Sequence, residues 1–86
     1  MGKRNKLREK ILLGNFDANI DFDDLCHLLR RWGFSERISG SHHIFSRNGI
    51  EEIINIQPKG RMTKSYQVAQ IRDMILRYRI GEQIND

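Results

Sequence analysis

The stretch from Glu36 to Pro58, ERISGSHHIFSRNGIEEIINIQP, decides the fold. Its apolar residues fall in short runs separated by Gly40 and by the pair Asn48 and Gly49. Short runs bounded by such residues predict strands, and Asn-Gly between two runs predicts a tight type I′ hairpin, which requires positive φ at both residues. Pro58 lacks an amide donor and is expected to close the last strand. We therefore expect three antiparallel strands, over residues 36–39, 42–47 and 50–57.

A helix is expected before these strands, beginning at Asp21 and ending before Gly33. The Asp21 side chain can cap the first free amides, and Ile20 and Leu25 occupy the positions of a hydrophobic staple around this cap. Gly33 followed by Phe34 predicts a Schellman stop. The apolar side chains between these ends recur at helical spacing: they are Phe22, Leu25, Leu29 and Trp32.

Two further helices are expected at the two ends of the chain. Residues 3–13 form a short one that Gly14 would end, and a last helix begins after Ser65, its expected cap, and stops at Gly81. Residues 59–64 between Pro58 and this helix have the composition of a basic loop. The order of elements predicts an α+β two-layer sandwich, in which helices cover one face of a three-stranded antiparallel sheet.

Length and composition limit the class of protein. The chain has 86 residues, so one small domain is expected, and no apolar run approaches the roughly 18 residues needed to cross a bilayer. A lone cysteine and the lack of a secretory signal predict a cytoplasmic protein. The formal net charge is +4, and residues 1–14, with five basic residues and one acidic, hold the whole excess. A polyanion such as nucleic acid is a candidate partner.

Two adjacent histidines, His42 and His43, are the first candidates for chemistry. Neighbours on a strand point to opposite faces, and the register decides which imidazole lies on the open face. On the open face, a histidine beside basic residues can remove a proton from a ribose 2′-hydroxyl. The pattern alone also allows a purely structural role, in which the two histidines are part of a half-buried strand surface. Together with Cys26 and His27 they match no zinc spacing, so we expect no metal and no cofactor. We expect the aromatic side chains to be structural: they are Trp32, Phe34, Phe45, Tyr66 and Tyr78.

From Phe22 to Ile80 the chain resembles the HicA toxin family. The resemblance rests on the helix end LRRWGF (29–34), the segment ISGSHHIF (38–45), Pro58, and a basic loop leading into an amphipathic helix. It implies a double-stranded-RNA-binding-like fold of α-β-β-β-α order, here with an extra N-terminal helix. It also implies the toxin of a type II toxin-antitoxin pair: a metal-independent endoribonuclease that cleaves mRNA and is inhibited by a HicB-like antitoxin.

The resemblance also implies roles for single residues. The catalytic histidine of the family follows Gly-Ser, so the general base would be His42, with Gly40 and Ser41 as turn and positioning residues and His43 as a secondary RNA contact. Many members carry a further histidine near the proline, where this chain has Gln57. The cations expected to bind phosphate, unless they form only a solvated basic loop, are Lys59, Arg61 and Lys64.

The expected organisation has three parts: a basic extension over residues 1–20, a HicA-like domain over 21–81 and a tail over 82–86. The expected partners are mRNA and the antitoxin, without a membrane or a small-molecule cofactor. The alternative function is a non-catalytic RNA-binding module of the same fold, because such modules read phosphates and 2′-hydroxyls by shape and need no histidine.

Overall fold

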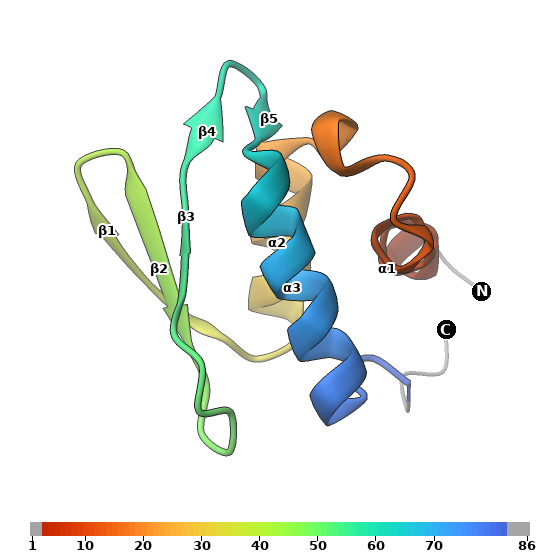
Figure 1. Cartoon of the computed structure of the whole chain (residues 1–86). Helices are drawn as coiled ribbons and strands as arrows, with labels where there is room; N and C mark the ends of the chain where they lie inside the picture. Colours follow the sequence, from red (N-terminus) through yellow and green to blue (C-terminus); the bar gives the residue numbers. More distant parts are fainter. Residues whose placement is uncertain (1–2, 83–86) are drawn as a thin grey trace.

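The computed structural model describes residues 3–82. The elements in chain order are α1 (Lys3–Leu13), η1 (Asp17–Asn19), α2 (Phe22–Arg31), β1 (Ser35–Ser39), β2 (His42–Ser46), β3 (Ile54–Ile56), β4 (Pro58–Lys59), β5 (Met62–Thr63) and α3 (Ser65–Tyr78). The first three strands form one antiparallel sheet in the order β1-β2-β3. Figure 1 shows α2 and α3 against one face of this sheet and α1 on the far side of these helices. The expected α+β architecture, with helices on one face, is confirmed.

Helix α2 has the ends that its sequence predicts. The Asp21 side chain accepts a hydrogen bond of 3.0 Å from the Asp24 amide, which satisfies one of the free donors of the first turn. At the other end Gly33 has φ of +90°, and the Phe34 amide donates to the Leu29 carbonyl over 3.1 Å. This bond, together with the one from Gly33 to Arg30, forms a Schellman motif.

The connection between β2 and β3 differs from the expected tight hairpin. Gly49 has positive φ and Asn48 does not, so the turn closed by the bond from the Ile50 amide to the Arg47 carbonyl is not of type I′. Phe45 pairs with Ile54, two residues beyond the register that a two-residue loop would give, and β3 begins at Ile54 instead of residue 50.

Side-chain chemistry explains this shift. A two-residue loop would place Glu52 opposite fully buried Phe45, with its carboxylate toward the helices. In the observed register Ile54 takes that place, and Glu52 lies outside the sheet, where it accepts hydrogen bonds from the Tyr78 hydroxyl at 2.7 Å and from Arg77 at 3.0 Å. A shift of two residues keeps each side chain on its face, so the core gains an isoleucine without exposing another apolar group.

Residues 59–64 were expected to form a loop, but most of them belong, with Pro58, to a small hairpin of β4 and β5. Gly60, with φ of +63°, begins its two-residue turn. Two backbone bonds of 2.9 Å connect this hairpin to the start of α2, one from Phe22 to Arg61 and one from Thr63 to Ile20. These bonds are between segments about forty residues apart in sequence, so no local pattern indicates them.

One hydrophobic core lies between the sheet and the helices and extends to α1. Ile11 in α1 and Ile20 before α2 are fully buried in it, so the described part of the expected extension belongs to the same unit as the rest of the chain. The remaining members come from the other elements: Phe22, Leu25, Cys26, Leu28, Leu29, Trp32, Phe34, Phe45, Ile54, Ile56, Val68, Ile71, Met74, Ile75 and Ile80. Of the expected tail, residues 83–86 lie outside the described residues.

Helix α3 does not have the expected ends. Lys64 is its N-cap residue and makes no side-chain cap bond, whereas Ser65 is already helical. At the other end the helix stops at Tyr78, before Gly81, because Arg79 adopts a left-handed conformation with φ of 54°. This reversal lets Ile80 donate to the Ile75 carbonyl and bury its side chain. Among residues 3–82 no helix has the length and apolar character that crossing a membrane requires.

Candidate functional site

The register places the two adjacent histidines on opposite faces of the sheet. His43 lies on the helix-covered face with Phe45 and is half-buried. The centre of its ring is 4.9 Å from that of Phe22, in an edge-on arrangement, and its Nδ1 lies 2.7 Å from a carboxylate oxygen of Glu36. His42 lies exposed on the other face, which no described element covers in Figure 1. Of the two imidazoles, only His42 is therefore open to a substrate on the free side of the sheet.

The hydrogen bonds of His42 define its tautomer. Nδ1 lies 3.0 Å from Oδ1 of Asn55, and an amide oxygen can only accept, so Nδ1 carries the proton. Nε2 lies 3.3 Å from the amide nitrogen of Gln57, which donates to it, so Nε2 has the lone pair. Both neighbours favour the same form of the ring, in which Nε2 is the basic atom.

Gln57 connects His42 to the rest of the site. Its side-chain nitrogen also lies 3.3 Å from Oγ of Ser41, and its oxygen accepts a 3.0 Å bond from Nζ of Lys64. Its backbone amide donates over 2.9 Å to the side-chain oxygen of buried Gln67, which holds the end of β3 against α3. The Lys64 cation is thereby held near the imidazole by one intervening side chain.

A depression of about 320 Å³ lies between β3 and the first turns of α3. It is lined by His42, Ile53, Asn55, Gln57, Tyr66, Gln67 and Gln70, and these residues are called the His42 groove below. Two large side chains in it are unusually open: Tyr66 is 59% exposed and Ile53 is 68% exposed. An aromatic ring open to solvent beside a polar groove is a surface on which a nucleic acid base can stack. Tyr66 is therefore a further candidate for the site. From the sequence it was expected to have only a structural role.

The structure brings together some of the predicted site residues. Gly40, with φ of +61°, forms the turn that leads into β2, and Ser41 and Lys64 contact Gln57 in the His42 groove. His43 is excluded, because it lies on the other face of the sheet.

The other two predicted cations lie on the β4–β5 hairpin, outside the His42 groove. Lys59 is exposed in β4. Arg61, at the turn, has a side chain that is 88% exposed and lies 3.9 Å from the Asp21 carboxylate. Of the three predicted cations, Lys64 is therefore the one whose side chain bonds to a residue of the His42 groove.

Comparisons with family models, with curated proteins and with solved structures gave no match to this chain.

Asn55 and Gln57 are functional candidates that the sequence interpretation missed. A weak signal exists for Asn55: it is the one polar residue in the run from Ile53 to Ile56, at a position whose side chain faces away from the core. For Gln57 the only signal is its place next to Pro58, where many members of the HicA family carry histidine. The contacts of Asn55 and Gln57 with His42 depend on the register of β2 and β3. The register predicted from the sequence differs by two residues from the observed one.

A second polar cluster lies beneath the sheet, where ligand atoms of Cys26, Glu36 and His43 all lie within 4.8 Å of one another. Burial raises the pKa of the Cys26 thiol to about 12, so the sulfur is protonated at neutral pH. The Glu36 carboxylate already accepts a 2.8 Å bond from Nε of Arg30 and a 2.7 Å bond from His43. The Arg30 cation and the protonated thiol both disfavour a metal ion here, and the arrangement is that of a structural hydrogen-bond network.

This network predicts an acid-dependent stability. The bonds from Arg30 and His43 lower the pKa of the Glu36 carboxyl, while its burial opposes them. The unfolded chain binds this proton more readily, so the contribution is present above the ordinary glutamate pKa of about 4.3 and is lost as the pH falls below it. Glu36→Gln is therefore expected to reduce the free energy of unfolding by about 1 kcal/mol at pH 7 and much less at pH 3.5.

Urea unfolding at the two pH values measures this difference. Glu51→Gln is the matched control, because Glu51 is exposed and its substitution removes the same charge. An equal loss of stability for the two variants at pH 7 would show that the network contributes nothing beyond net charge.

Proposed function

We propose that the chain is a metal-independent endoribonuclease in which Nε2 of His42 takes the proton of a ribose 2′-hydroxyl. The observation that carries this proposal is the pair of contacts from Asn55 and Gln57, which hold the exposed ring as the tautomer with a basic Nε2. Gln57 occupies this lone pair in the free protein, and an incoming hydroxyl would replace it. The displaced amide is then free to donate to a phosphate oxygen.

The chemistry needs few groups because RNA carries its own nucleophile. The 2′-oxygen forms a bond to the adjacent phosphorus as its proton passes to His42, and the bond from phosphorus to the 5′-oxygen breaks. Solvent protonates the leaving oxygen, so the products are a 2′,3′-cyclic phosphate and a 5′-hydroxyl. Negative charge grows on the phosphoryl oxygens, and Lys64, which is bonded to Gln57 beside His42, would stabilise it.

The groove supplies contacts for a single strand of RNA. Bases can stack on the open Tyr66 ring or lie against Ile53, while the polar side chains Gln67 and Gln70 line the rest of the depression. Stacking of this kind tolerates different bases, because each base has an aromatic face. A single-stranded substrate fits better than a duplex, whose bases are stacked on one another and not available to Tyr66.

The resemblance to the HicA family extends this proposal to a biological role. The order α2-β1-β2-β3-α3 supports the double-stranded-RNA-binding-like fold of that family. The Gly40-Ser41-His42 segment supports its toxin activity on cytoplasmic mRNA. A HicB-like antitoxin would then inhibit the protein by covering the His42 groove, with exposed Ile53 at the interface. Protection of His42 from chemical modification in the complex would support direct inhibition, and an accessible His42 would contradict it.

Incubation of single-stranded RNA with the purified chain in EDTA tests the activity. We expect cleavage with 2′,3′-cyclic phosphate ends, which resist ligation until the ring is opened and the remaining phosphate is removed. Binding without cleavage would instead identify the alternative, an RNA-binding module of the same fold. Products with 5′-phosphate ends would exclude the 2′-hydroxyl mechanism, because water or another nucleophile would then have attacked.

Asn55 gives a prediction about positioning. Asn55→Ala frees the ring to rotate and to change tautomer, and we expect the cleavage rate to fall tenfold to a hundredfold, about the loss that misplacing a reacting group causes. Asn55→Asp keeps an acceptor at Nδ1 but adds a negative charge, which favours the protonated imidazole. Its rate should recover at high pH, with the acidic limb of the pH–rate profile moved upward. The measurement is the profile of kcat for the two variants and the wild type.

A purely structural role for Asn55 would give a different pattern. Both variants would then lose activity in proportion to the unfolded fraction, and the shape of the profile would not change. Ser39→Ala serves as the control, because Ser39 is exposed in β1, on the same face of the sheet, and outside the groove.

A further inference from the structure

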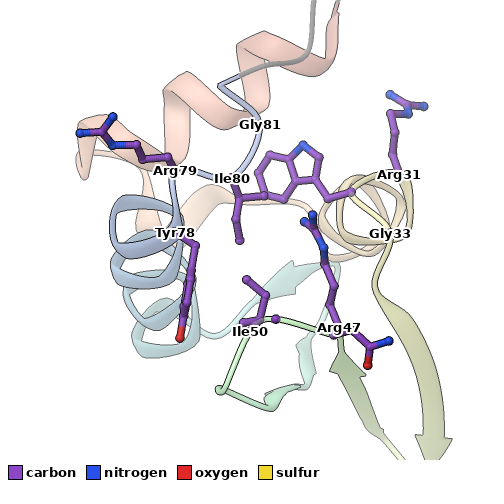
Figure 2. Close-up of a pocket in the computed structure, with 11 residues that line it drawn as sticks. Arg31, Gly33, Arg47, Ile50, Tyr78, Arg79, Ile80 and Gly81 are labelled. Carbon is purple, nitrogen blue, oxygen red and sulfur yellow. The ribbon is translucent and has the colours of Figure 1, made fainter.

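A second depression, of about 510 Å³, lies at the end of the sheet away from the Gly40 turn, where α2 and α3 both end. Figure 2 shows Arg47 reaching across it, with Arg31 and Arg79 on either side and their guanidinium groups turned outward. Its lining consists of Arg31, Trp32, Gly33, Arg47, Asn48, Gly49, Ile50, Tyr78, Arg79, Ile80 and Gly81, called the arginine pocket below. The sequence interpretation assigned no function to any of these residues.

The arginine pocket has three cations and no carboxylate in its lining. Arginines elsewhere in the described chain mostly pair with acids, as Arg72 does with Asp17 at 2.9 Å and Arg77 with Glu52 at 3.0 Å. Within residues 3–82, Arg31, Arg47 and Arg79 have no such partner. Three arginines without acidic partners around one depression make its surroundings positively charged, which favours an anion.

The arginines could instead be present only to balance the helix ends. Two helices end here, and each contributes about half a negative charge, so together they offset roughly one of the three cations. Close to two positive charges remain. Arg47 is also outside any helix, in the connection after β2, and its guanidinium lies 5.8 Å from the centre of the Phe34 ring. Helix-end electrostatics therefore explains at most part of this cluster.

The backbone of Arg79 gives an independent observation. Of the residues other than glycine in the described chain, it alone has positive φ, at the position after a helix where glycine is normally found. The chain does have glycine close by, at Gly81, yet carries arginine at the strained position. A side chain kept against the preference of its backbone is typical of residues selected for function.

The floor of the arginine pocket is apolar. Ile80 and Trp32 are almost completely buried, while Ile50 and Tyr78 are half-buried at its sides. The Tyr78 hydroxyl is already bonded to Glu52, which in turn pairs with Arg77, so the ring of Tyr78 and not its polar tip is available. Flat apolar walls beneath arginine side chains suit a ligand with an aromatic part and an anionic part, and the volume lies in the range of small-molecule sites.

We propose that the arginine pocket binds one nucleotide of an RNA strand and its flanking phosphates, with the base against Ile50 and Tyr78, one phosphate on Arg47 and the neighbouring phosphate on Arg79 at the rim. This inference rests on the proposed ribonuclease function and gives the substrate a second contact. Arg47 comes five residues after His42, just beyond the end of β2, a span of about 16 Å, so one strand several nucleotides long can reach both sites. The pocket would then hold RNA outside the cleavage point and contribute affinity without taking part in the chemistry.

Titration with adenosine 5′-monophosphate tests the pocket without any cleavage. In proton–nitrogen NMR spectra of the full chain, we expect shifts of the Gly49 and Gly81 amides and of the Trp32 indole at millimolar nucleotide. The absence of shifts at these three positions would overturn the inference. So would shifts produced by a short polyglutamate peptide but not by the nucleotide, because they would identify an acidic protein segment as the occupant.

Two substitutions test the contribution to RNA binding, in a His42→Ala background that leaves the RNA intact. Arg47→Gln and Arg79→Gly should each lower the slope of log affinity against log salt by about 0.7 for a single strand. Arg79→Gly also relieves the positive φ, so its melting temperature should rise while its RNA affinity falls. Arg77→Gln, which removes the same charge two residues earlier and outside the pocket, should leave the affinity nearly unchanged.

These results separate the pocket from the ribonuclease activity. Cleavage by the wild type together with an unchanged salt slope for Arg47→Gln and Arg79→Gly would overturn the pocket and leave the activity. Nucleotide shifts in the pocket without RNA cleavage would support the pocket and contradict the proposed function. If Arg77→Gln lost as much affinity as Arg47→Gln and Arg79→Gly, the inference would be overturned, because the loss would then depend only on net charge and not on the pocket.

Discussion

His42→Ala is expected to lower the rate of RNA cleavage by roughly 100- to 10,000-fold, the range that loss of a general base produces. The side chain is exposed and its contacts are to Asn55 and Gln57 at the surface, so the substitution should change the free energy of unfolding by no more than about 0.5 kcal/mol. A large kinetic effect with a small effect on stability is the expected signature of a catalytic group. The measurements are the single-turnover rate with a defined RNA and the urea midpoint of the same sample.

His43→Ala is the matched control, because it removes the same imidazole from the adjacent position. His43 contacts Glu36 and Phe22 beneath the sheet, so this variant should lose stability yet keep its rate per folded molecule. A normal rate in His42→Ala would remove His42 from the mechanism. A loss of rate in both variants that followed their unfolded fractions would indicate that neither histidine is catalytic.

The contrast between the two histidines shows what the sequence can predict. Alternation along a strand requires that His42 and His43 face opposite ways, but it does not say which of them faces the helices. The answer comes from Phe45, which is fully buried and has the same parity as His43. The resemblance to a family assigns catalysis to His42, which follows Gly40 and Ser41, and this assignment stays a prediction; the structure shows that His42 is the histidine on the open face.

Local contacts were enough to predict both ends of one helix. This helix is α2: its Asp21 cap and its stop at Gly33 depend on bonds between residues at most five positions apart. The β2–β3 register was wrong because it depends on distant residues. Glu52 leaves the sheet to reach Tyr78 in α3, 26 positions along the chain, and Asn-Gly alone could not reveal that preference.

The same distant contact determines the composition of the candidate site. A two-residue hairpin would place Asn55 directly across from His42 and keep Gln57 away. In the observed register Asn55 pairs with Ile44, and the chain continues so that Gln57 comes beside His42, whose two nitrogens then contact both amides. The site therefore depends on the core, because the register that supplies Gln57 is the one that buries Ile54 against the helices.

Phe45→Ala is consequently the substitution with the largest expected effect on the fold. Phe45 is fully buried and lies between Glu36 in β1 and Ile54 in β3, so its removal leaves a cavity at the centre of the sheet. We expect the free energy of unfolding to fall by about 3 to 5 kcal/mol, as for other buried phenylalanines. This is a large part of the roughly 5 to 15 kcal/mol that a domain possesses. Urea denaturation measures it, and Phe45→Leu gives a milder cavity where the alanine variant does not fold.

Ile44→Ala is the control for this effect, because it removes the adjacent apolar side chain from the other face. Ile44 is half-buried on the open side, so its truncation should cost about 1 kcal/mol. The two variants should also differ at the site: loss of Phe45 weakens the register that brings Gln57 to His42, and cleavage per folded molecule should fall, whereas Ile44→Ala should retain it. An equal loss of unfolding free energy in the two variants would mean that the face carrying Phe45 is not the core face. The assignment of His42 to the open face would then also be wrong.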